Sequence, residues 1–157
     1  MQSGLAAYRE HGAGFGVPTF LGILAEAYQE LGRAKDGLQA IAEALALAEH
    51  TGSHYWDAEL RRLEGTLALQ SHTHGSGTSS AHRRAEACFQ RAIEIAQHQE
   101  ARTLELRAAM SLSRLWHSQA RRGEAHALLS EVFGKFTEGF DTADLIDAKA
   151  LLEETAA

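Results

Sequence analysis

A single proline, Pro18, occurs in this chain of 157 residues. Proline lacks a backbone donor and breaks helices, so the chain after Pro18 can form helices without that interruption. Ala, Leu, Glu, Gln and Arg, which favour helices, are abundant, whereas Val and Ile, which favour strands, are scarce. The sequence therefore predicts an all-α protein.

Apolar residues recur at helical spacing in successive segments of the chain. Pro18 suits the first turn of a helix that ends near Gly32, and the next predicted helix ends near Gly52. Ser53 is a suitable N-cap for a third helix. Ser79 or Ser80 could cap a later one, which would include His82.

Near the C-terminus, Asp141 is the expected cap of a final helix. Asp144 is favourably placed in its first turn, where the helix dipole stabilises a carboxylate.

The helices fall into pairs with a recurring pattern of large and small residues. The spacing after Leu24 matches the tetratricopeptide unit, and the spacing after Leu112 repeats it. The pair that contains Leu63 has the correct spacing within its second helix, but that helix begins several residues late. We therefore expect an inserted loop at residues 71–79 between the two helices of this pair.

These repeats predict one tetratricopeptide-like domain, a right-handed stack of antiparallel helical hairpins with about 7–8 helices. Small residues at the crossing let two helices approach closely, and each hairpin buries its remaining apolar face on the next. The expected parts are a half-unit at 3–12, repeats at 18–51, 53–98 and 100–137, and a terminal helix at 141–154.

Four runs in this order resemble a known kind of protein region: AELRRLEG (58–65), AEACFQRAIEIAQ (85–97), ELRAAMSLSRLW (105–116) and FTEGFDTADLIDAKALLEE (136–154). They are similar to the C-terminal tetratricopeptide-like region of large bacterial signalling proteins. Those proteins join a nucleotide-cyclase or DNA-binding module to a signal-transduction ATPase and this helical region. The resemblance implies a regulatory module that binds a protein or another domain of a larger parent, without catalytic residues of its own.

The first helix of each pair is expected to line a concave groove, at fixed positions relative to Leu24, Leu63 and Leu112. An acidic wall and a basic, partly apolar wall would face each other, and arginine–carboxylate pairs could hold a peptide there. The alternative is that these side chains form ordinary solvated helix faces. The candidate groove residues are Glu26, Gln29, Glu30, Arg61, Arg107, Met110, Arg114 and His117.

Histidines and the cysteine are the remaining candidates for chemistry. His72, His74 and His82 could hold a metal ion, but the first two lie among Gly and Ser without a rigid frame, so a flexible insertion is the preferred interpretation. His50 and His54 have ligand spacing, which Gly52 interrupts. Another alternative is a nucleophilic role for Cys88; we expect a buried structural thiol. We predict no metal, no cofactor and no enzyme activity.

Charge and hydropathy limit the partners. The net charge of −6 argues against a nucleic-acid binder, and no apolar run is long enough to span a membrane. A lone cysteine and a start without a secretory signal favour a cytoplasmic location. The alternative to a binding module is a structural capping or self-association module, such as a homodimer, without a separate ligand.

Overall fold

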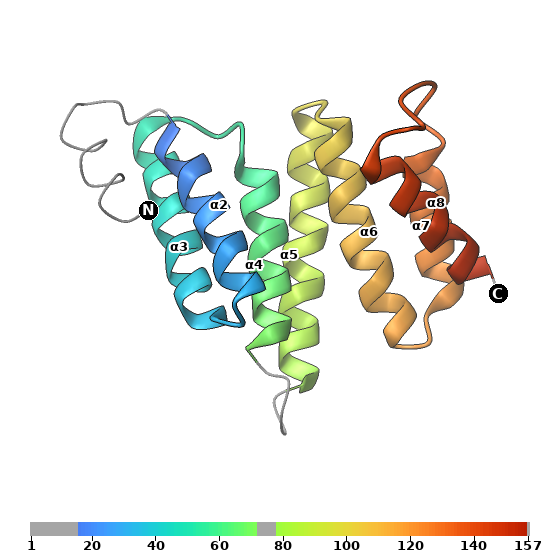
Figure 1. Cartoon of the computed structure of the whole chain (residues 1–157), viewed down its shortest axis with the longest axis horizontal. Coiled ribbons are helices and arrows are strands. Elements are labelled where there is room, and N and C mark those ends of the chain that lie inside the picture. Colours follow the sequence, from blue (N-terminus) through green and yellow to red (C-terminus); the bar gives the residue numbers. More distant parts are fainter. Residues whose placement is uncertain (1–15, 72–77, 157) are drawn as a thin grey trace.

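The computed structural model describes residues 16–71 and 78–156, and this part of the chain contains seven helices and no strand. The prediction of an all-α protein is confirmed. Figure 1 shows that the chain crosses the molecule from the α2–α3 pair at one end to the α7–α8 pair at the other. They are α2 (Val17–Glu30), α3 (Ala34–Thr51), α4 (Asp57–Gln70), α5 (Thr78–His98), α6 (Arg102–Ser118), α7 (Arg122–Phe133) and α8 (Ala143–Ala156).

Helices that follow each other in the sequence run antiparallel and pack together, and they form two layers (Figure 1). Helices α2, α4, α6 and α8 form an inner layer, in which each contacts the next. Helices α3, α5 and α7 form an outer layer behind it. This arrangement places side chains from four separate segments along one face.

The ends of the helices follow local chemistry. Pro18 lies in the first turn of α2, as predicted. Gly52 adopts a left-handed conformation with φ of 68°, and the Ser53 amide then donates to the Ala48 carbonyl at 3.0 Å, which closes α3.

Two apolar clusters hold the helices together, one in α2–α4 and the other mainly in α5–α8. Helices α4 and α5, which join them, approach closely at Gly65. A Cβ atom at this position would lie 2.6 Å from the Phe89 ring. The absence of a side chain at Gly65 therefore lets Phe89 pack directly on the α4 backbone.

Several predicted boundaries differ from the structure. Ser53 does not cap α4, which begins at Asp57; Ser53 is instead buried beside the end of α3. Helix α5 begins at Thr78, so the end of the predicted 71–79 loop and the proposed caps Ser79 and Ser80 are helical.

Asp141 likewise precedes α8, which begins at Ala143, although Asp144 lies in its first turn as predicted. The half-unit at 3–12 and residues 72–77 of the loop lie outside the described residues. Within the described ranges, no helix has the length and apolar character needed to cross a membrane.

Candidate binding groove

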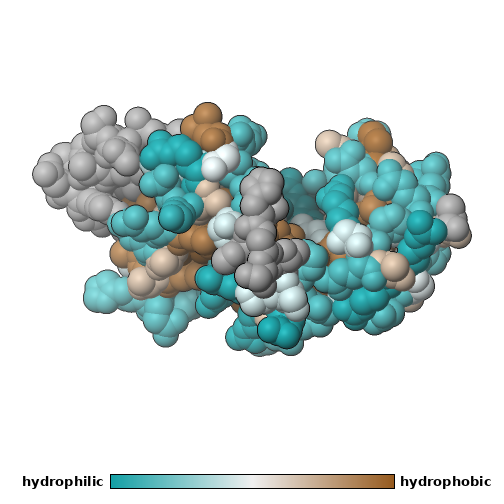
Figure 2. Space-filling model, turned by 90° about the horizontal axis from the view of Figure 1, so that it is seen from below, coloured by the Kyte–Doolittle hydropathy of each residue, from teal (hydrophilic) through white to brown (hydrophobic). Residues whose placement is uncertain are grey.

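A hollow on the molecular surface lies between the two ends of the row of helices (Figure 2). Two adjacent pockets lie on this side of the molecule, and their lining comes mainly from the inner-layer helices. They share Arg62, Ser111 and Arg114, so they form one continuous groove.

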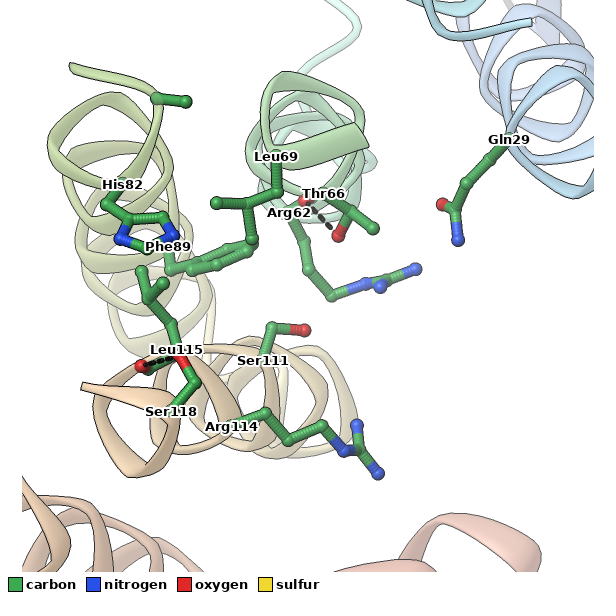
Figure 3. A pocket seen from close by; sticks show the side chains of 11 residues that line it. Gln29, Arg62, Thr66, Leu69, His82, Phe89, Ser111, Arg114, Leu115 and Ser118 are labelled. Atoms are coloured by element: carbon green, nitrogen blue, oxygen red, sulfur yellow. Dashed lines mark hydrogen bonds between the residues drawn. The ribbon is translucent and has the colours of Figure 1, made fainter. Parts of the chain in front are cut away.

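The larger pocket has a volume of about 460 Å³. Leu69, Phe89 and Leu115 form its apolar wall, at the junction of α4, α5 and α6 (Figure 3). Arg62 and Arg114 extend their guanidinium groups away from that wall (Figure 3). The complete lining is Gln29, Arg62, Thr66, Leu69, Ala81, His82, Phe89, Ser111, Arg114, Leu115 and Ser118.

The smaller pocket, of about 260 Å³, is polar and extends towards α8. Its lining brings three carboxylates and three arginines together. These residues, with Met110 and Ser111, are Glu26, Arg62, Arg107, Met110, Ser111, Arg114, Asp144 and Asp147.

A chain of ion pairs connects three inner helices along this groove. The Glu59 carboxylate, only 4% exposed, accepts hydrogen bonds from Arg62 Nε and Nη2 at 2.9 and 2.7 Å. Arg107 Nη1 lies 3.9 Å from the same carboxylate, and Arg107 Nε donates to Asp144 at 2.9 Å. A buried carboxylate needs such partners, because a buried unpaired charge is costly. The network therefore fixes Arg62 and Arg107 in place.

Burial alone would lower the pKa of Arg62, but the hydrogen bonds and charge of Glu59 outweigh burial, and the pKa is raised. Arg62 is therefore a permanently charged part of the groove.

Arg114 differs from its two neighbours. Its side chain is exposed and makes no ion pair with any residue that the structure describes. Because neither Glu59 nor Asp144 holds it, the guanidinium group keeps its hydrogen-bonding capacity for a ligand.

Five of the eight candidate groove residues line the two pockets: Glu26, Gln29, Arg107, Met110 and Arg114. Arg61 does not; it pairs with Glu64 on its own helix at 2.9 Å. Glu30 is exposed and His117 is partly buried, and neither belongs to the lining of these pockets.

Arg62, Thr66 and Ser111 also line the groove, and the pattern of the repeats did not predict them. Arg62 and Ser111 stand directly before Leu63 and Leu112, one position away from those chosen for the groove. The small rotation of each helix about its axis decides which position faces the groove, and apolar spacing does not determine this rotation. Asp144 and Asp147 were also not predicted to line the groove. The predicted terminal helix could have indicated them, because a further helix after three pairs can extend the inner layer.

A second polar cluster holds α5, α6 and α7 together. The Glu86 carboxylate accepts hydrogen bonds from Trp116 Nε1 at 2.7 Å and Arg121 Nη1 at 2.9 Å. Arg121 also lies over the Trp116 ring, 4.5 Å from its centroid, and binds Glu124. Burial alone would raise the pKa of Glu86. The hydrogen bonds from Arg121 and Trp116 have the larger effect, so the pKa lies below its usual range. The cluster is structural, because its groups are occupied with one another.

The histidines do not converge on a common site in the described part of the chain. His50 belongs to the end of α3, and His54 follows Gly52 and pairs with Asp57 at 2.8 Å. His82 lies on α5, as predicted, and lines the larger pocket. His72 and His74 fall outside the described residues, within which no group of three His, Cys, Asp or Glu side chains could hold a metal ion.

Cys88 lies half-buried on α5, less buried than expected. Burial and the nearby Glu64 carboxylate raise the pKa of its thiol to about 11. Since the thiolate is the reactive form, these surroundings suppress nucleophilic chemistry at Cys88.

In comparison with known proteins, the chain is similar to part of a much longer protein. No protein-family model and no solved structure matches it. An uncharacterized protein of Rhizobium meliloti (strain 1021) is 32% identical over 114 residues, which make up 73% of this chain. The match covers 10% of the relative, so the chain spans about a tenth of the length of the curated relative it matches.

Proposed function

We propose that this chain is a non-catalytic, tetratricopeptide-like module, a right-handed stack of helical hairpins whose groove binds a segment of a protein partner. The observation that carries the proposal is the groove itself, in which Arg114, without an ion pair to any described residue, lies beside an apolar pocket. Arginine forms strong two-pronged hydrogen bonds with carboxylates, and an adjacent apolar pocket supplies burial.

We also propose that the module regulates a larger bacterial signalling protein, by binding another of its domains or a separate protein. The much longer Rhizobium meliloti relative supports a role within a larger chain. The lone Cys88 suits the reducing cytoplasm as the place of action.

Selection of peptides from a random displayed library tests the binding function without knowledge of the partner. Ser111→Trp would fill the junction of the two pockets, and Ser130→Trp, at an exposed position of α7, is the matched control. We expect selected peptides to bind the wild type and Ser130→Trp equally and to lose binding to Ser111→Trp. Peptides that bind all three proteins equally would refute a groove-binding function.

Self-association is a second candidate, supported by apolar side chains exposed on α2. Phe20 is 50% exposed and Ile23 46%, and Leu31, just after the helix, is 70% exposed. Light scattering distinguishes the candidates. A homodimer through this surface should become monomeric with Ile23→Glu, whereas a wild-type monomer at high concentration would exclude self-association.

A further inference from the structure

The hydroxyl groups that line the larger pocket can act towards a ligand only as hydrogen-bond acceptors. The hydroxyl groups of Thr66, Ser111 and Ser118 each donate to a carbonyl of their own helix, at 3.1, 3.0 and 2.6 Å. Having donated their protons, these oxygens can only accept hydrogen bonds from a ligand.

Gln29 adds a fourth acceptor from the opposite side of the pocket (Figure 3). Its Oε1 atom is buried and has no hydrogen-bond partner in the described structure. A buried acceptor without a partner is unfavourable, so a ligand that supplies an N–H group at Gln29 would be stabilised.

Two arginines, Arg62 and Arg114, supply the donors. Arg62 donates to Glu59 through Nε and Nη2, so its Nη1 group can donate to a ligand. Arg114 forms no ion pair with a described residue, so all of its N–H groups can donate to a ligand. A ligand must therefore place a negatively charged hydrogen-bond acceptor next to Arg114. It must also place a large apolar group against the wall formed by Leu69, Phe89 and Leu115.

We infer that the groove recognises an extended peptide segment with a large aliphatic or aromatic side chain and an Asp or Glu two residues away. The backbone N–H groups of a peptide can donate hydrogen bonds to Gln29 Oε1 and to the three hydroxyl oxygens. A simple carboxylic acid has no N–H group and would leave these acceptors without a donor. Side chains two residues apart point to the same side of an extended chain, so one can enter the apolar pocket while the other meets Arg114.

A single carboxylate is favoured over an acidic run. Glu26 and Asp147, both exposed and without ion pairs among the described residues, line the neighbouring pocket. Further carboxylates of the ligand would meet like charges there, which opposes binding. This inference rests on the proposed groove-binding function and specifies the chemistry of its ligand.

The test uses four peptides with free groups blocked at both ends: Gly-Ser-Leu-Ser-Asp-Ser-Gly and versions with Asn or Lys for Asp, or Ala for Leu. Binding is measured by NMR titration of the full chain. We expect the Leu/Asp peptide to bind about tenfold more tightly than the Asn and Ala versions, since each loses one anchoring interaction.

Arg114→Glu should reverse the preference, so that the Lys peptide binds best. Arg122→Glu, the same change at an exposed position of α7, should keep the wild-type order. Equal affinities of the Asp, Asn and Lys peptides at the groove would overturn the carboxylate specificity and leave groove binding intact. If none of the four peptides shifts groove resonances while library-selected peptides do, the inferred motif is wrong and the proposed function stands. If library peptides also leave the groove unaffected, both fail.

Discussion

At the scale of single residues, the close approach of α4 and α5 depends on one missing side chain. Gly65 lies against the buried Phe89 ring, with room for no Cβ atom. Gly123 in α7 has the opposite surroundings, since a Cβ there would meet nothing within 4 Å. The two glycines therefore form a matched pair that separates packing from helix propensity.

Gly65→Ala should lower the free energy of unfolding by about 1–3 kcal/mol, because the added methyl group overpacks a filled site. Gly123→Ala should leave it unchanged or raise it by up to about 1 kcal/mol, because alanine favours the helix. Urea denaturation measures both. Equal effects of the two substitutions would show that Phe89 does not pack as described.

The pKa of Glu86 gives a second test at this scale. A carboxyl group whose pKa is lowered on folding stabilises the protein above its unfolded pKa, about 4.3, and this contribution disappears as the pH falls through the folded value. Glu86→Gln should therefore reduce stability at pH 7 and make the fall in unfolding free energy between pH 5 and pH 3 shallower. Parallel stability curves for the two proteins would contradict the cluster with Trp116 and Arg121.

At the scale of helices, α8 completes the groove and is attached to the inner layer partly by charge. Asp144 in its first turn accepts a hydrogen bond from Arg107 on α6. The pair is partly exposed, so its contribution is small, about 1 kcal/mol or less. Asp147 on the same helix has no ion pair within the described chain, and it provides the control.

Asp144→Asn should raise the rate of hydrogen exchange in α8 by a few fold and leave α2–α4 unaffected, because the α8 attachment weakens while the N-terminal apolar cluster is unchanged. Asp147→Asn should change exchange in α8 much less. If α8 exchanges equally in both variants, the Arg107–Asp144 pair does not hold the helix.

Much of this level of organisation is readable in the sequence. Apolar spacing identified the helices α2–α8 and placed Pro18 and Gly52 at their ends. Spacing did not give the start of α4, because the Ser53 amide is used in closing α3 and a turn at residues 55–56 precedes Asp57. It also placed Arg61 in the groove instead of Arg62, because the rotation of α4 is set by packing with α2, α5 and α6 together.

At the scale of the whole molecule, two layers of helices create one face on which four segments distant in sequence meet (Figure 1). The Glu59 network pairs two of the three groove arginines, Arg62 within α4 and Arg107 between α4, α6 and α8, whereas Arg114 has no ion pair in the described part of the chain. The sequence did not show this difference between paired and unpaired arginines, because Arg107 and Arg114 were both simply candidate groove residues. The difference makes Arg114 the better position for a binding test, because reversing Arg107 would also disturb the fold.

The most direct test of the central claim is where a library-selected peptide binds. NMR chemical-shift changes should be largest at Gln29, Thr66, Ser111, Arg114 and Ser118, along the inner side of the stack. The outer side of α3 and α7 should show none. Changes confined to the outer helices, or to the exposed apolar side chains of α2, would contradict a binding function for the groove.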